Sequence, residues 1–476
     1  MTTAEVTGPV GSATVSVIAQ LGAKAVHLAL NVVSTLAILR YLAPNAYGTY
    51  VLVLTVTTLA GVIADFGLPK LAVREMVRPG EDQDAVAGTI IAIRLVLAIV
   101  AVAACQGVVA LFHEPPAAHL AAAVASLVIV GEAVLGILVV AFQIRLVQQY
   151  EAGIRVVAEA IETGLVLWLV SRAVSLPWLF VPPVAGVVVA LVVATALTRR
   201  RFALRPRLVA ARIRPILAEA LPLGPALLVG VAYLKLDSFV VAALRPPADL
   251  GIYGAAYQPI EYLFLATAVI INVIFPLLAK AWGEGQTDRF LAIYRRGTEL
   301  LVIVTGFVTV TVVFLAAALV RTAFGPAYAA SAAPLGVLSA ALVLMAVNAW
   351  QSLVLLSGGH QRTVLRYNVV ALGVSIVLCV VLVHLVGMIG AAVSAFLTGV
   401  VVLGASTRAV GRRMHATLDG RRLGQVAVAS LATGAFVAAL SAVRMPWPLI
   451  VVAATVPYAV MLGGLGFHRS IREAFA

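Results

Sequence analysis

The sequence predicts an all-α polytopic membrane protein of about fourteen transmembrane helices, arranged as two pseudo-symmetric six-helix lobes plus a C-terminal helix pair. Composition is the first reason: 62% of the 476 residues are hydrophobic and 11% are charged, with a mean hydropathy of +1.08. Soluble proteins average about half apolar and a quarter charged residues. The other two reasons are basic residues that alternate between successive loops and a short motif that occurs twice.

Fourteen apolar runs are long enough to cross a bilayer, because a spanning helix needs about 20 mostly apolar residues. The first run follows a stretch, 1–13, that contains no Lys or Arg. This run is too long for a signal peptide, so we expect it to be retained as a helix. The expected spans are 14–41, 47–66, 87–112, 117–143, 154–174, 177–198, 217–243, 251–279, 297–320, 331–356, 364–386, 388–407, 423–443 and 446–467.

The basic residues support this count and give an orientation. Of the 33 lysines and arginines, 25 fall on one side of the predicted membrane and five on the other, and a missed span would disturb that pattern. Because basic loops stay in the cytoplasm, we expect both termini to be cytoplasmic, in a bacterial or archaeal cytoplasmic membrane. The remaining three lie well inside predicted spans rather than at their ends: Lys24, Arg94 and Lys235.

Several function classes are disfavoured. Both cysteines, Cys105 and Cys379, lie in apolar runs, so neither a disulfide framework nor a metal site is expected. The sequence has no GxxxxGK[ST], HExxH or GxSxG motif and no loop with room for a catalytic domain, so we expect no cofactor and no enzyme. The net charge of +13 is explained by orientation and attraction to anionic membrane lipids, without a nucleic-acid partner, even for the arginine-rich stretch from Arg199.

Polar residues of the first span share one helical face. Gln20, Lys24, His27, Asn31 and Ser34 recur at spacings of 4, 3, 4 and 3 residues. Hydrogen bonds between helices would explain Asn31 or Ser34 taken singly. A lysine about 15 Å deep at the helical rise favours a cavity lining for the whole stripe.

The seventh and eighth spans carry a second set of polar residues. Tyr253, Tyr257 and Glu261 lie on one face of the eighth span, and the tyrosines also suit the membrane interface, whereas Glu261 lies deeper. In the seventh span, Lys235 and Asp237 are two residues apart and point to nearly opposite faces, so they do not form a simple local ion pair. We expect Lys235 to face the interior.

Charged residues of the third to fifth spans leave alternatives open. Glu132, near the middle of the fourth span, either pairs with a cation such as Arg94 or Lys24 or carries a proton. A group at the start of the fifth span shares one face and suggests a structural salt-bridge ladder near the cytoplasmic side. This group is Arg155, Glu159 and Glu162.

A short motif occurs twice, as "RYLAPNAYGTY" at 40–50 and "LRPPADLGIYG" at 244–254. Pro44 then falls on Pro247 and Gly48 on Gly251, 203 residues apart. Six spans separate the copies, so the repeat is parallel, with an N-lobe at 1–200, a C-lobe at 201–410 and a helix pair at 411–476. We expect each copy to be an outer turn, and Arg40 either guards the outer mouth of a cavity or caps its helix.

The segments "RYLAPNAYGTYVLV…IADFGLPKLAVRE" and "LPLGPALLVGVAYLKLDSFVVAALRPPADLGIYGAAYQPIEYLF…FPLLAK" resemble the two half-signatures of Wzx-type polysaccharide flippases of the MOP superfamily. "LVGMIGAAVSAFLTG" fits the later spans of that family. The resemblance implies two lobes around a central cavity with alternating access, and a glycan carried on a polyprenyl diphosphate. Because an anionic diphosphate requires cations, the substrate candidates are Lys24, Arg94 and Lys235, with Gln20, His27, Asn31 and Tyr257 for sugar hydroxyls.

Four functions are weighed. A lipid-linked oligosaccharide flippase is the main prediction, with glycosyltransferases or a glycan polymerase as further partners. An ion-coupled multidrug extruder and a lipid II flippase are alternatives, and an intramembrane glycan polymerase or transferase fits less well because the predicted outer loops are short. Coupling to an H⁺ or Na⁺ gradient would use carboxylates, for which the candidates are Glu132, Asp237 and Glu261.

Overall fold

The computed structural model describes residues 9–112, 114–145, 147–202, 205–443, 445–464 and 466–467, with the side chains of 9–21 and 201–202 outside that description. These residues form α-helices and short 3-10 helices, and no strand occurs among them. Within the described part, 13 helices are long and apolar enough to cross a membrane. The predicted span that is not among these 13 is the fifth, 154–174; it corresponds to α6 (Gln149–Ser171), whose apolar stretch is interrupted by Arg155, Glu159 and Glu162. The predicted all-α polytopic membrane fold is confirmed.

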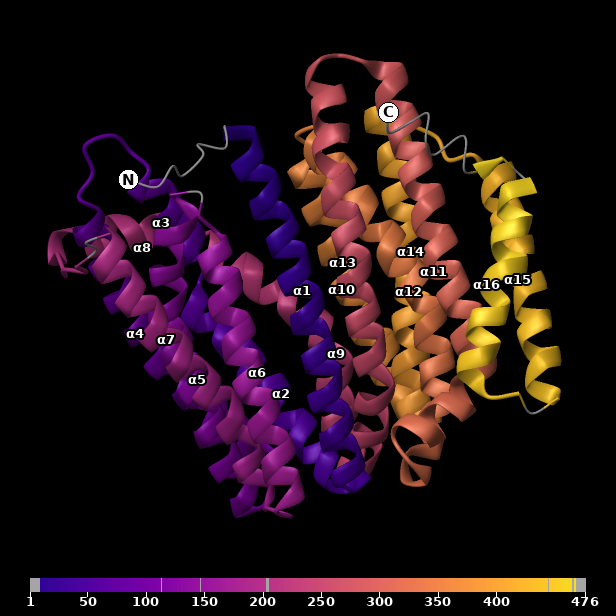
Figure 1. Cartoon of the computed structure of the whole chain (residues 1–476), viewed down its shortest axis with the longest axis horizontal. Helices are drawn as coiled ribbons and strands as arrows, with labels where there is room; N and C mark the ends of the chain where they lie inside the picture. Colours follow the sequence, from indigo (N-terminus) through magenta and orange to yellow (C-terminus); the bar gives the residue numbers. More distant parts are fainter. Residues whose placement is uncertain are drawn as a thin grey trace, which may run out of the picture. The chain divides into compact units, whose positions relative to one another are not determined.

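Contacts divide the chain into two compact units, Met1–Lys235 and Leu236–Ala476. The division falls inside α9 (Leu223–Leu244). In unit 1, α1 packs on α6, α2 packs on α4 and α5, and α7 packs on α5 and α6. The elements before α9 are α1 (Pro9–Tyr41), α2 (Pro44–Asp65), α3 (Leu68–Met76), α4 (Gln83–Leu111), α5 (Pro116–Gln143), α6, η1 (Leu176–Phe180), α7 (Val181–Phe202), η2 (Ala210–Arg212) and α8 (Ile213–Ala220) (Figure 1).

Unit 2 repeats this packing. Here α10 packs on α11 and α12, and α14 packs on α12 and α13, as α2, α4, α5, α6 and α7 do in unit 1. The final two helices pack on each other and on α11 (yellow in Figure 1). The elements are α10 (Pro247–Gly283), α11 (Thr287–Ala323), η3 (Pro326–Ser331), α12 (Ala332–Ser357), α13 (Gln361–Val386), α14 (Met388–Met414), α15 (Gly420–Ala442) and α16 (Trp447–Gly464).

The repeated motif starts equivalent helices in the two units. Pro44 is the first residue of α2 and Pro247 is the first residue of α10. Proline suits this position because the first helical N–H has no partner within the helix. Gly48 and Gly251, one turn further on, are both buried, so both helices begin in close packing. The repeat predicted from sequence therefore corresponds to a repeat of packing.

Candidate functional site

Two polar stripes face each other in unit 1. One lies on α1 and contains Lys24, His27, Asn31 and Ser34; Gln20 belongs to the same helix, but its side chain lies outside the described residues. The other stripe lies on α6 at a spacing of four residues, which keeps its members on one face. It consists of Glu151, Arg155, Glu159 and Thr163.

Hydrogen bonds connect the two stripes at several levels. Asn31 Nδ2 donates to Glu159 Oε1 at 2.8 Å, and His27 Nδ1 lies 3.0 Å from Glu159 Oε2. One turn further along, the Ser34 hydroxyl donates to Thr163 Oγ1 at 3.0 Å. Both carboxylate oxygens of Glu159 are therefore bound by α1. Because the pairs advance in the same order on both helices, α1 and α6 run parallel.

Exposure changes along the stripes. Glu159, Ser34 and Thr163 are buried, while the side chain of His27 is 50% exposed. Lys24, one turn nearer the N-terminus of α1, is exposed. The stripes thus lead from a closed, hydrogen-bonded region into an open one.

The open end is a pocket of about 630 Å³. Arg155 is held at its wall by Glu132 and Glu151, each 3.6 Å from a guanidinium nitrogen, and Gln143 Nε2 donates to Glu151 Oε2 at 3.3 Å. Pockets for small ligands typically measure roughly 300–1,000 Å³. The lining residues are Ala23, Lys24, His27, Gln143, Gln148, Glu151, Ala152, Arg155 and Val156.

The lining suits a ligand that is both anionic and rich in hydroxyl groups. Lys24 and Arg155 supply positive charge, and the attraction of a phosphate to such groups strengthens as water is removed. Gln143, Gln148 and Glu151 offer amide and carboxylate groups of the kind that bind sugar hydroxyls. We therefore take this pocket, named here the α1–α6 pocket, as the candidate functional site.

Arg94 lies outside this pocket. Its side chain is 4% exposed and sits in the core of unit 1, where Nη2 lies 3.1 Å from Asp65 Oδ1 and Nε donates to the Ala64 carbonyl at 3.4 Å. The guanidinium thus meets the C-terminal end of α2, where a positive charge is favourable. Its substrate role stays a prediction.

The candidates on α9 and α10 lie elsewhere. Asp237 accepts hydrogen bonds from the Tyr253 hydroxyl and from the Ser238 amide, and Tyr253 stacks on Tyr257 with ring centroids 6.1 Å apart. Their substrate and ion-coupling roles stay predictions, as do those of Lys235 and Glu261, which are partly exposed. Arg40 lies in the last turn of α1, a position compatible with either role expected for it.

Two pairings differ from those that the sequence suggested. The sequence left open whether Glu132 pairs with a cation such as Arg94 or Lys24 or carries a proton, and in the structure its carboxylate lies 3.6 Å from Arg155 Nη1 of α6. The expected ladder within α6 is also wrong in detail, because Glu159 turns to His27 and Asn31 of α1. Spacing within one helix identifies a face but not the helix that packs against it.

Sequence reasoning missed the pocket residues Gln143, Gln148 and Glu151. Glu151 continues the four-residue spacing of Arg155 and Glu159, so the periodicity of α6 contained a usable signal. The two glutamines lie at the end of α5 and just before α6, where polar residues are ordinary in a loop. Their contribution becomes visible only when the two helices are placed.

The chain is similar to known proteins both in sequence and in fold. Residues 13–282 match the family model described as polysaccharide biosynthesis protein. Among curated proteins, no sequence matches. Among solved structures, the lipid II flippase MurJ in an inward closed conformation is similar with a TM-score of 0.76 at 11% identity, covering 96% of this chain and 100% of that chain.

Two further structures show the same architecture. An inward-facing MATE-family multidrug resistance transporter of the MOP superfamily has a TM-score of 0.58 at 14% identity, over 82% of this chain and 99% of that one. A MOP superfamily transporter from Pyrococcus furiosus Vc1, described as having a binding pocket of reverse polarity, has a TM-score of 0.61 at 14% identity, over 85% and 96%. At these identities the likeness establishes the fold alone.

Proposed function

Since the chain belongs to the polysaccharide biosynthesis protein family, we propose that it flips a polyprenyl-diphosphate-linked oligosaccharide from the cytoplasmic to the outer leaflet, for cell-surface polysaccharide. The protein is a MOP-type membrane transporter by family and fold. The proposed cycle is alternating access between two lobes in a bacterial or archaeal cytoplasmic membrane. Glycosyltransferases or a glycan polymerase would supply or consume the glycan.

The α1–α6 pocket is the observation that carries this proposal. Lys24 is exposed at the pocket and Arg155 lies across it, so a diphosphate placed between them would meet two cations. Gln143 and Gln148 would then bind the first sugars. The lipid tail has no need to enter, because its hydrocarbon is stable in the surrounding bilayer.

Energetics favour Lys24 as the primary phosphate ligand. Arg155 already has two carboxylate neighbours, which offset its charge. Because Lys24 is exposed and one turn from His27, it presents its charge to an entering head group. Arg94 and Lys235 remain candidates for a later stage of the passage. Coupling to an H⁺ or Na⁺ gradient remains part of the proposal, with Glu132, Asp237 and Glu261 as candidates.

The test is transport by purified protein in liposomes that contain a polyprenyl-diphosphate glycan. We expect Lys24→Ala to lower the initial rate at least about tenfold, equivalent to about 1.4 kcal/mol, whereas Lys24→Arg retains most of it. Lys70→Ala, which removes an exposed lysine of α3, is the matched control. Thermal unfolding confirms that all variants are folded. Full transport by Lys24→Ala would exclude this lysine as the phosphate ligand.

The second candidate, an ion-coupled multidrug extruder, is favoured by one observation. Three carboxylates lie in or beside the α1–α6 pocket and its stripes: Glu132, Glu151 and Glu159. Carboxylates attract organic cations. The same liposomes distinguish the two functions. Efflux of a cationic dye without movement of the glycan lipid would favour the extruder, and movement of lipid II alone would favour a lipid II flippase.

A further inference from the structure

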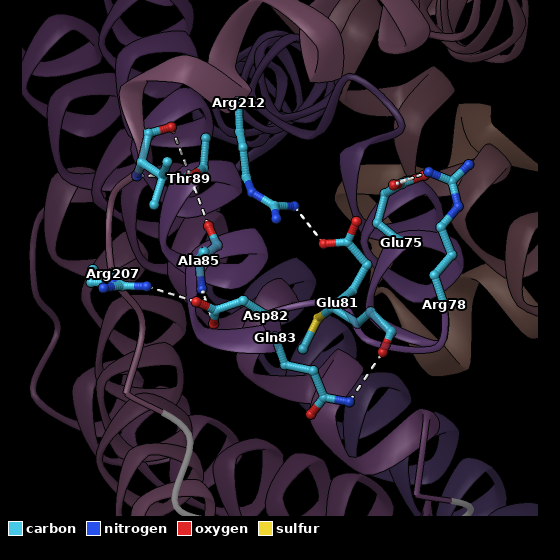
Figure 2. Close-up of polar contacts among 11 residues, drawn as sticks. Glu75, Arg78, Glu81, Asp82, Gln83, Ala85, Thr89, Arg207 and Arg212 are labelled. Atoms are coloured by element: carbon cyan, nitrogen blue, oxygen red, sulfur yellow. Dashed lines mark hydrogen bonds and ion pairs between the residues drawn. The ribbon is translucent and has the colours of Figure 1, made fainter.

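The arginine-rich connector between α7 and α9 lies against the first turns of α4. We name residues 205–220 the strap; it comprises an extended segment, η2 and α8. Figure 2 shows Arg207 pointing to Asp82 and Arg212 pointing to Glu81, the residues just before α4. From the sequence, these arginines were explained by membrane orientation and by attraction to anionic lipids, so no contact within the protein was assigned to them.

Backbone groups of the strap are hydrogen-bonded to α4. The amide of Arg207 donates to the carbonyl of Asp84 at 2.8 Å, and the amide of Arg205 donates to Asp84 Oδ1 at 2.9 Å. The amide of Val209 donates to Thr89 Oγ1 at 3.1 Å. These three hydrogen bonds hold the first part of the strap, residues 205–209, against the first turns of α4.

Gly88 allows this close approach. A Cβ added at Gly88 would lie 2.2 Å from the amide nitrogen of Arg207 and 2.4 Å from its carbonyl carbon. These are backbone atoms, which cannot rotate away as the end of a side chain can. The strap therefore occupies the space that any other residue at position 88 would need.

Ion pairs add to the docking. Arg207 Nη2 lies 2.6 Å from Asp82 Oδ2 and Arg212 Nη1 lies 2.6 Å from Glu81 Oε2. Solvent-exposed ion pairs contribute little to stability, so these two select the register of the strap more than they hold it in place. A third pair joins Glu219 of α8 to Arg74 of α3.

The chain stays on unit 1 beyond the strap. A Cβ added at Gly67 would lie 2.5 Å from a side-chain carbon of Leu223, and one added at Gly224 would lie 2.3 Å from the Phe66 ring. Phe66 and Gly67 have positive φ angles of 45° and 74°, and form the corner between α2 and α3. The beginning of α9 is thus packed into that corner.

From these contacts we infer that the strap is a fixed part of unit 1 in every state of the protein, so that the basic connector is not the joint between the two units. The joint then lies beyond Gly224. A charged linker without such contacts would instead repel itself and extend.

Proteolysis tests the docking without any transport assay. Trypsin does not cut before proline, so within the strap the bonds Arg207–Leu208 and Arg212–Ile213 are the informative sites. We expect the full-length protein to resist cleavage there, and Gly88→Ala to be cut at least tenfold faster. Gly107→Ala, on the same helix with no atom within 4 Å of the added Cβ, should match wild type. Equally fast cleavage of wild type and Gly88→Ala would overturn the inference.

Cross-linking tests whether the strap stays docked during transport. This second experiment rests on the proposed function, because it measures movement of the glycan lipid. In a chain with Cys105 and Cys379 replaced by alanine, Asp82→Cys and Arg207→Cys are joined by a cleavable bifunctional thiol reagent. We expect the linked protein to keep at least half of the initial rate of the unlinked one. Loss of transport that returns on cleavage would overturn the inference. If the unlinked protein moves no glycan lipid, the proposed function fails, and the proteolysis result still decides the strap.

Discussion

Arg94 illustrates how a charged side chain is accommodated in an apolar core. Two of its nitrogens are bound at the end of α2, by Asp65 and the Ala64 carbonyl. Among the described residues, the third, Nη1, has no hydrogen-bond partner, and it faces Gly136 of α5. A Cβ at Gly136 would lie 2.4 Å from that nitrogen. The guanidinium therefore depends on a glycine for its space.

Gly136→Ala is expected to destabilise the protein by about 1–3 kcal/mol, the usual cost of overpacking. Arg94 cannot move aside without losing its pair with Asp65. Gly164→Ala on α6, where no atom lies within 4 Å of the added Cβ, is the control and should be neutral or slightly stabilising. The measurement is thermal unfolding in detergent. Equal midpoints for the two variants would contradict this view of Arg94.

Arg94→Met separates a structural role from a substrate role. Removal of the arginine leaves Asp65 without its cation, and the 41% exposure of that carboxylate moderates the cost. We expect a lower unfolding temperature and an unchanged transport rate per folded molecule. A normal unfolding temperature together with lost transport would instead favour direct contact between Arg94 and the diphosphate.

At the scale of elements, α1 packs on α6, and the two polar stripes lie along that contact. The Ser34–Thr163 hydrogen bond is buried, and Thr163 also donates to the Leu30 carbonyl at 3.4 Å. Hydrogen bonds between membrane helices average about 0.6 kcal/mol. A double-mutant cycle with Ser34→Ala and Thr163→Val should therefore give a coupling energy of about 0.5–1 kcal/mol. Strict additivity of the two unfolding free energies would show that this bond contributes nothing.

The sequence predicted one stripe of this pair and left the other ambiguous. Spacing identified Lys24, His27, Asn31 and Ser34 as one face, because helical periodicity is a local property. It did not identify Glu159 as their partner, since that contact joins residues 128 positions apart. The starts of helices are also encoded locally, since Pro44 and Pro247 begin α2 and α10. The sequence did not show which helix faces pack against each other.

The docking of the strap on α4 should be insensitive to pH over the physiological range. The Ala85 amide, and to a lesser degree the Arg207 guanidinium, hold the pKa of Asp82 below its ordinary value of 3.8. A carboxylate whose pKa is lowered in the folded state stabilises that state at every pH above its ordinary pKa. This stabilisation is lost as the pH falls through the lowered pKa. Hydrogen exchange at the Val209 amide should therefore show constant protection from about pH 8 to about pH 5.

Asp82→Asn tests whether the Asp82 carboxylate is the group that makes the docking sensitive to acid. Asparagine caps a helix as well as aspartate does, so α4 keeps its first turn while the ion pair to Arg207 is lost. We expect slightly weaker protection of the Val209 amide, without an acid-dependent change from this position. Loss of wild-type protection between about pH 7 and pH 5 would mean that another group controls the docking.

At the scale of the whole molecule, the two units repeat a packing scheme that the sequence reveals only at the motif. Proline and glycine are needed there for backbone reasons, so they persist in both copies. Elsewhere the two units differ in detail: Glu159 of α6 binds α1, whereas Tyr367 of the equivalent helix α13 meets the Ser352 hydroxyl of α12 at 2.6 Å. A shared architecture thus carries two different sets of polar groups, and the α1–α6 pocket belongs to unit 1.

The orientation of the whole molecule gives the last prediction. The connector between α10 and α11 follows an even-numbered predicted span and the connector after α11 follows an odd-numbered one, so they should face opposite sides of the membrane. We expect Gln286→Cys to react with an impermeant thiol reagent only from the cytoplasmic side and Ala327→Cys only from outside, because basic loops stay inside. Both positions are exposed, and Cys105 and Cys379 are buried. Reaction of both from the same side would contradict the fourteen-span map, and reaction from exchanged sides would contradict the expected cytoplasmic position of both termini.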